Sequence, residues 1–201
     1  MKHLFSQIIL RGILSCLFAC TVKNKENKDV PAVPLSQHYS NDFFSLDYPS
    51  DWGIEEEISN MYDTIPAMSK GIRITLYNSN PDSKLHTVMI QKSAMFECFQ
   101  TPEGWRDASI IQLKQFDDRY IGTAESYMLD SLHFGPYPAA MAGFVVALES
   151  GDTLIHKQMV VLVGKDLYYL NNSFDWHDDG TLQKKGDSIL SSVRFTDTNE
   201  Q

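Results

Sequence analysis

Acidic side chains and a histidine gather in one stretch of the sequence, DWHDDG at residues 175–180. Carboxylates together with an imidazole are groups that could hold calcium or a transition metal. A calcium-binding EF-hand loop is excluded, because His177 occupies its third position and Gly186 stands where the bidentate glutamate belongs. The alternative is a solvated loop whose acids favour the positive N-terminus of the helix that follows.

Aromatic and amide side chains precede that loop in DLYYLNNSFDW, residues 166–176. Such a set could line a surface for a ligand or a glycan, or it could serve core packing. Strand alternation sends Tyr168 and Tyr169 to opposite faces, so at most half of the set shares one surface. A small-molecule or metal site would therefore be sought at residues 168–179. The candidate ligand or metal residues are Tyr168, Asp175, His177 and Asp179.

The sequence GDSIL at residues 186–190 imitates the Gly-Asp-Ser motif of a hydrolase family. In that motif the serine needs an exposed strand-to-helix turn near the start of the fold. Ser188 instead falls inside the last predicted helix. The accompanying Asp-x-x-His should follow the serine, whereas Asp130 and His133 precede it. We therefore predict no catalytic residue and no enzyme activity.

The remaining histidines and the internal cysteine indicate no further site. His86 and His156 fall in predicted strands, and a metal or acid–base site would need such residues to converge. Cys98 lies among apolar residues, which indicates a small buried side chain. We assign neither a metal nor a cofactor.

Alternating apolar residues predict the strands that position these side chains. Ile72, Ile74 and Leu76, for example, fall on one face of a strand. Met159–Val163 is apolar on both faces, which is typical of a central strand. We expect strands over residues 44–48, 71–79, 85–93, 123–134, 139–150, 153–164 and 167–174, and another that starts at Trp52.

Two stretches change to helical spacing. The residues TPE at 101–103 provide an N-cap, a proline at the first helical position and an acid in the first turn, which predicts a helix over 102–118. Apolar residues at i, i+7, i+8 and i+11 from Leu182 predict a helix over 181–193. The order is strands, helix, four-strand meander, helix. We predict an α+β fold in which helices cover one face of an antiparallel sheet.

Residues 1–19 have the pattern of a secretory signal peptide. Lys2 and Arg11 supply positive charge, and the apolar run is too short and too interrupted to span a bilayer. The sequence LFAC at 17–20 resembles the lipobox of bacterial lipoproteins, which implies cleavage before Cys20 and its acylation with fatty acids such as palmitate. The sequence ILSC, which ends at Cys16, also fits. We prefer Cys20 because polar residues follow it at once.

The sequence therefore divides into four regions. They are a signal peptide at 1–19, a flexible acylated tether at 20–40, a globular domain at 41–197 and a tail at 198–201. The chain has 26 acidic and 17 basic residues and a net charge of −9. Proteins that bind nucleic acid are usually basic, so we predict no nucleic-acid partner.

Three short sequences together resemble the PsbP-like fold. They are FSLDYPSDW at 44–52, the Gly-x-x-Pro-Ala step from Gly135 to Ala139, and ILSSVRF at 189–195. That fold is shared by an extrinsic photosystem subunit, a small Ran-binding import factor and many bacterial lipoproteins. The resemblance covers Asp42 to Phe195. It implies an α/β/α sandwich and a non-enzymatic binding or assembly module.

The function predicted from the sequence is that of a bacterial cell-envelope lipoprotein. Its lipid anchor would hold it on a membrane, facing the periplasm or the cell surface, where it would act as a non-catalytic binding or assembly module with a possible protein partner. The alternative is a small-molecule or metal-binding protein that uses residues 168–179.

Overall fold

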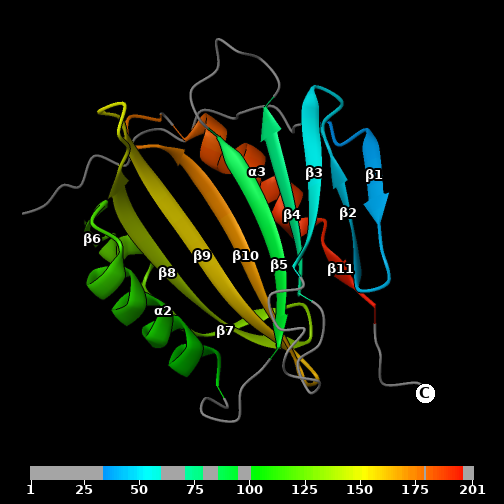
Figure 1. Ribbon diagram of the computed structural model, residues 1–201. Coiled ribbons are helices and arrows are strands. Elements are labelled where there is room, and N and C mark those ends of the chain that lie inside the picture. Colours follow the sequence, from blue (N-terminus) through cyan, green and yellow to red (C-terminus); the bar gives the residue numbers. More distant parts are fainter. Residues whose placement is uncertain (1–33, 60–70, 79–85, 95–100, 179, 197–201) are drawn as a thin grey trace, which may run out of the picture. The chain divides into compact units, whose positions relative to one another are not determined.

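The computed structural model describes residues 34–59, 71–78, 86–94, 101–178 and 180–196 (Figure 1). By its internal contacts the chain divides into two units, Met1–Pro31 and Ala32–Gln201. Every described residue belongs to the second unit. Within the described ranges, neither helix has the length and apolar composition that a membrane span requires.

A long antiparallel sheet forms the centre of this unit (Figure 1). Its strand order is β3-β4-β5-β10-β9-β8-β6, and β7 also pairs with β8. The strands are β3 (Trp52–Ser59), β4 (Gly71–Asn78), β5 (Thr87–Ala94), β6 (Tyr120–Thr123), β7 (Leu129–Phe134), β8 (Tyr137–Ala147), β9 (Thr153–Val163) and β10 (Asp166–Asp175). A smaller antiparallel sheet contains β1 (Gln37–Ser40), β2 (Phe44–Tyr48) and β11 (Arg194–Phe195).

The predicted α+β fold with an antiparallel sheet is confirmed. The predicted meander corresponds to β7, β8, β9 and β10, and β9 is a central strand between β8 and β10. Its hairpin turns have glycine where the backbone turns left-handed, with φ of 89° at Gly151 and 61° at Gly164. Only glycine adopts such angles without steric cost, so the sequence fixes these turns locally.

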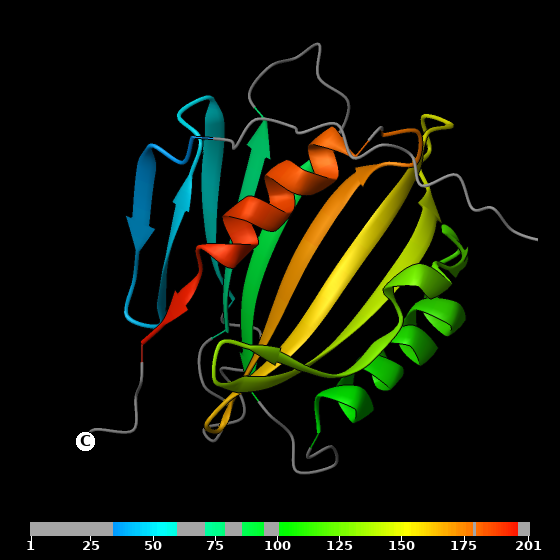
Figure 2. The ribbon, with the colours of Figure 1, turned by 180° about the vertical axis from the view of Figure 1, so that it is seen from behind.

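The two helices lie on opposite faces of the long sheet (Figure 2). Trp105 of α2 (Pro102–Phe116) belongs to a core cluster with Val160, whereas Ile189 of α3 (Thr181–Ser191) belongs to a cluster with Val161. Adjacent residues of a strand point to opposite faces. The prediction that helices cover one face is therefore wrong. The physical reason is that β9 is apolar on both faces, and both faces must be covered.

The helix ends follow the predicted signals closely. Thr101 accepts a hydrogen bond from the backbone N–H of Gly104 at 3.2 Å, and this confirms the predicted N-cap of α2. Each helix stops two residues before its predicted end, because Asp117 is extended and the N–H of Ser192 turns back to the carbonyl of Ile189. The chain then enters β11, which pairs with β2.

Three segments differ from the sequence predictions. Residues 37–40, assigned to the tether, form β1 because they pair with β2. Residues 120–123 form β6 and pair with β8, whereas the predicted strand starts only at residue 123. The strand expected over 123–134 is broken by the short 3-10 helix η1 (Glu125–Tyr127), and β7 starts only at Leu129. None of the side chains in these short strands is fully buried, so a pattern based on apolar alternation does not reveal the strands.

Candidate functional site

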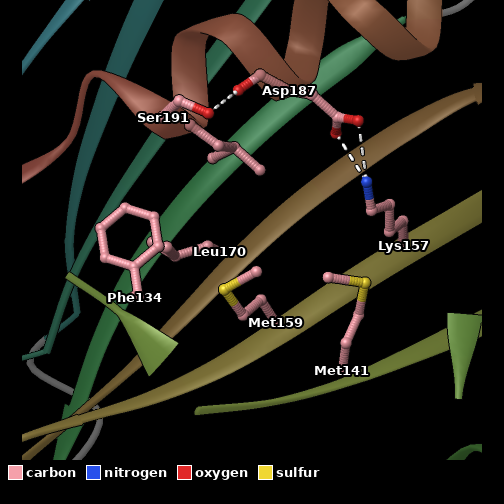
Figure 3. A pocket seen from close by; sticks show the side chains of 8 residues that line it. Phe134, Met141, Lys157, Met159, Leu170, Asp187 and Ser191 are labelled. Carbon is pink, nitrogen blue, oxygen red and sulfur yellow. Dashed lines mark hydrogen bonds and ion pairs between the residues drawn. The ribbon is translucent and has the colours of Figure 1, made fainter. Parts of the chain in front are cut away.

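A cavity of about 240 Å³ lies between α3 and the sheet (Figure 3). Apolar side chains form most of its lining: Phe134, Met141, Met159, Leu170 and Leu190. Met141 and Met159 are paired on neighbouring strands, and both side chains point toward α3. Methionine is flexible and polarisable, so this lining adapts readily to the shape of a ligand.

One part of the lining is polar. The ammonium of Lys157 donates to both carboxylate oxygens of Asp187, each at 2.8 Å (Figure 3). The hydroxyl of Ser191 donates to the backbone carbonyl of Asp187 at 2.7 Å. The side chains of Lys157 and Asp187 are 14% and 35% exposed, so the ammonium is mostly buried and the carboxylate is partly exposed to water. The cavity thus combines an apolar lining with an ion pair of opposite charges.

Asn172 of β10 fixes α3 over this cavity. Its amide nitrogen donates to Asp187 Oδ1 at 3.1 Å and to the backbone carbonyl of Gln183 at 2.9 Å. Asn172 is fully buried. A buried amide that lost these partners would carry a large desolvation cost, so the helix is held in one position on the sheet.

Gly186 allows α3 to lie close to the side chain of Asn172 on β10. A Cβ atom at this position would overlap the side-chain amide of Asn172. Glycine inside a helix costs about 1 kcal/mol relative to alanine, and here the cost is offset by the contact that it permits. The hydroxyl of Ser188, two residues later, donates to the carbonyl of Lys184 within α3. The GDSIL sequence therefore has a packing explanation.

His86 extends the polar network into the core. Its Nε2 lies 3.1 Å from Asn172 Oδ1. Because Asn172 already donates through its amide nitrogen, its oxygen must accept, and His86 must carry a proton on Nε2. Burial lowers the pKa of His86 to about 4, although the hydrogen bond to Asn172 acts in the opposite direction. At neutral pH the network therefore contains an uncharged imidazole.

Tyr127 of η1 contacts both sides of the site. Its hydroxyl donates to the side-chain carbonyl of Gln183 at 3.1 Å, and its ring centre lies 5.6 Å from the ammonium of Lys157. An ammonium over an aromatic face is attracted to it, so Tyr127 helps to hold Lys157 beside Asp187.

His156 lies on the opposite face of the sheet from His86. Its Nδ1 is 2.6 Å from the hydroxyl of Ser173, and its ring stacks on Phe144 at 5.9 Å. Burial lowers the pKa of His156 to about 4. The two histidines do not converge on one site, which agrees with the structural roles predicted for them.

The structure does not bring the candidate ligand residues together. Tyr168 is 1% exposed and packs against Phe195 on the face that α3 covers. Asp175 is also buried, but it lies on the other face and at the opposite end of β10, roughly 23 Å away for a strand of this length. His177 is exposed, and its backbone N–H donates to Asp175 at 2.7 Å. Asp179 lies outside the described residues.

The acidic loop stabilises the start of α3. Asp178 accepts hydrogen bonds from the backbone N–H groups of Leu182 and Gln183, at 3.1 and 3.0 Å. This confirms the interpretation that acids of the loop favour the helix N-terminus. In the described part of the chain, no three His, Cys, Asp or Glu residues are grouped so that they could hold a metal ion.

The three cysteines lie outside the described residues. Acylation of Cys20, the alternative at Cys16, and the buried position of Cys98 therefore stay predictions.

Sequence reasoning missed the residues that form the cavity. The signals were present but ambiguous: Lys157 interrupts an apolar strand, and Gly186 interrupts a helix. Asn172 appeared only as one amide of a polar and aromatic stretch. These residues come from separate elements, and only the tertiary fold brings them together.

Comparisons with known proteins identify a fold but no family. No protein-family model matches the chain, and no curated protein matches it. Among solved structures, LpqN of Mycobacterium tuberculosis, described as involved in cell envelope biogenesis, is 16% identical with a TM-score of 0.53. The match covers 80% of this chain and 91% of LpqN. This likeness shows a shared fold.

Two further structures resemble the chain less closely. A Bacteroides thetaiotaomicron protein is 14% identical with a TM-score of 0.48, and the match covers 84% of this chain and 51% of that protein. The chain thus spans about half the length of that protein. Cyanobacterial PsbP (CyanoP) of Synechocystis is 14% identical with a TM-score of 0.47, and the match covers 90% and 99%. Membership of the PsbP-like family stays a prediction.

Proposed function

We propose that this protein is a membrane-anchored lipoprotein of the bacterial cell envelope, and that its domain is a non-catalytic binding module for a small molecule. The observation that carries the proposal is the cavity under α3, with its apolar lining and one polar part. Concave, mostly apolar sites with a few placed polar groups are typical of small-molecule binding. The ligand would lie on β8, β9 and β10, with α3 above it.

The envelope location has two supports. LpqN, which shares this fold, is described as involved in cell envelope biogenesis. The residues before Cys20 resemble a lipobox, and two or three acyl chains hold a domain stably on a membrane where one does not. Together they favour a module that works at a membrane surface.

The polar groups of the cavity favour binding over catalysis. Lys157 is an ammonium paired with a carboxylate, so it offers no lone pair for nucleophilic attack. Ser191 donates its hydroxyl proton to a backbone carbonyl, and none of the described residues that line the cavity is a histidine that could activate it. These groups are suited to orient a ligand by hydrogen bonds.

Native mass spectrometry of the full-length protein, purified from its own cells, tests the proposal. Two variants accompany it. Met159→Trp fills the cavity, whereas Ile121→Trp adds the same side chain at a position that is 60% exposed. We expect a bound small molecule on the native protein and on Ile121→Trp, but none on Met159→Trp.

Two outcomes would contradict the proposal. A ligand that stays bound to folded Met159→Trp would place binding outside the cavity. No ligand on any of the three proteins would refute the binding function. Circular dichroism verifies folding, and Met141→Phe replaces Met159→Trp if the larger side chain prevents it.

A further inference from the structure

We propose that the cavity under α3 takes an uncharged amphipathic molecule, with an apolar chain and a head group that carries a hydroxyl or an amide. This inference rests on the proposed binding function and names the class of ligand. Apolar surface, charge and hydrogen-bonding groups are distributed unevenly along the lining, and this distribution selects the ligand (Figure 3).

The apolar part of the lining selects a hydrocarbon chain. Phe134, Met141, Met159 and Leu170 offer only carbon and sulfur atoms to the cavity, and they lie together on one side of it (Figure 3). Polar atoms of a ligand would lose their hydrogen bonds to water against such a surface. This part of the cavity therefore favours an apolar chain.

The charges at the polar part cancel. Lys157 and Asp187 form a close ion pair, and Asn172 donates a further hydrogen bond to the carboxylate. A charged head group beside this pair would be attracted by one member and repelled by the other, so it would gain little from the pair while it loses its own hydration. Separating this partly buried pair would also be unfavourable, so the pair selects against anionic and cationic head groups alike.

The same groups retain unused hydrogen-bonding capacity. An ammonium has three N–H donors, and the carboxylate of Asp187 takes two of those on Lys157. Among the described residues, Asp187 Oδ2 accepts only from Lys157, so it has a lone pair to spare. The hydroxyl of Ser191 can still accept a hydrogen bond. A hydroxyl or amide, which both donates and accepts, satisfies this arrangement without adding charge.

Three probes test the class of ligand, and each carries an apolar chain of the same length, either dodecyl or lauroyl. Monolauroylglycerol is uncharged with hydroxyl groups, laurate is anionic and dodecyltrimethylammonium is cationic. Binding is measured by isothermal titration calorimetry below micelle formation. The full mature chain carries Cys20→Ser, so that its own acyl chains cannot compete. We expect monolauroylglycerol to bind about tenfold more tightly than either charged probe.

Two variants shift the charge of the site in opposite directions. Asp187→Asn leaves Lys157 uncompensated, so laurate should gain about tenfold relative to monolauroylglycerol. Lys157→Met leaves Asp187 uncompensated, so dodecyltrimethylammonium should gain instead. General damage to the fold cannot produce two opposite changes. Asp118→Asn and Lys165→Met alter exposed charges away from the cavity lining and should change neither preference.

The outcomes separate this inference from the proposed function. Tighter binding of laurate or dodecyltrimethylammonium by the unaltered cavity would overturn the uncharged class. If none of the probes binds while a cellular ligand is lost on Met159→Trp, the binding function stands and the class is wrong. If none of the probes binds and the native protein also carries no cellular ligand, both the binding function and the ligand class are wrong. Unchanged preferences in Asp187→Asn and Lys157→Met would refute the role of the ion pair.

Discussion

At the scale of single residues, Asn172 decides how α3 is held on the sheet. Its amide joins the imidazole of His86, the carboxylate of Asp187 and a helix carbonyl in one hydrogen-bonded network. Each of these groups is fully or partly buried, so the loss of one partner leaves another without a hydrogen bond. The cavity depends on this network because Asp187 belongs to both.

Gly186→Ala tests the contact between α3 and Asn172. Alanine favours helices by about 1 kcal/mol, but its Cβ would overlap an amide that is fixed by three hydrogen bonds. Overlap in a packed core typically costs 1–3 kcal/mol, and the upper half of this range applies because the amide cannot move without losing its hydrogen bonds. After the helical gain is subtracted, we expect a net loss of about 1–2 kcal/mol in the free energy of unfolding. Urea denaturation measures it.

Gly122→Ala is the matched control, because nothing lies within 4 Å of a Cβ added there. That variant should unfold at the same urea concentration as the native protein, or slightly higher. Equal stability of the two variants would show that α3 moves aside freely, and that Asn172 does not fix its position.

The buried histidines predict a loss of stability in acid. The pKa values of His86 and His156 are about 4 in the folded protein, against 6.5 when exposed. Between these values the unfolded chain binds more protons, so the free energy of unfolding decreases as the pH falls from 6.5 to 4. Each histidine contributes at most about 3 kcal/mol to this decrease.

His86→Gln should remove about half of that pH dependence, because only His156 then remains. Urea denaturation at several pH values between 4 and 7 measures the effect. His133→Gln, at an exposed position, serves as the control and should retain the full dependence. An equal pH dependence in His86→Gln and the native protein would contradict the assignment of a neutral, buried His86.

At the scale of elements, the start of α3 depends on a carboxylate that precedes it. Asp178 accepts from the N–H groups of Leu182 and Gln183, which have no partner within the helix. Asp178→Ala should therefore lower the free energy of unfolding by about 1 kcal/mol. Asp118→Ala, at an exposed acid in a turn, should change it by less than about 0.5 kcal/mol. Thermal unfolding of both variants checks this difference, and equal midpoints would refute the cap.

The elements with strong apolar periods were predictable from the sequence. Strands β8, β9 and β10, and both helices, lie where the apolar spacing and the N-cap at Thr101 put them. The short strands β1 and β6 were not predictable, because backbone pairing with a neighbour, rather than side-chain burial, defines them. The apolar residues on both faces of β9 indicated that both faces of the sheet would be covered. The order of elements alone suggested helices on one face.

At the scale of the whole molecule, the site lies where separate elements meet. Lys157 comes from β9, Asn172 from β10 and Asp187 from α3, and no local motif joins them. The sequence favoured the local stretch 168–179 for this reason, since local clusters are what a single sequence displays. Alternation along β10 then separates Tyr168 and Asp175 onto opposite faces, so proximity along the chain does not become proximity in space.

The membrane anchor is a prediction about the whole molecule that the N-terminal sequence makes on its own. Each buried CH₂ of an acyl chain contributes about 0.8 kcal/mol, so fatty acids on one cysteine suffice to hold this acidic domain on a membrane. Cys20→Ser should abolish incorporation of labelled palmitate in the organism's own cells. Intact-mass measurement of the native protein should give a chain that starts at Cys20 and carries acyl groups.

Cys16→Ser is the matched control, because the residues before Cys16 fit the same pattern. It should leave both the label and the mature mass unchanged. Loss of label in Cys16→Ser alone would move the anchor to that cysteine, and with it the start of the mature chain. Label that persists in both single variants and in the double variant would show that acylation at these cysteines does not anchor the protein, and the binding module would then need another route to the membrane.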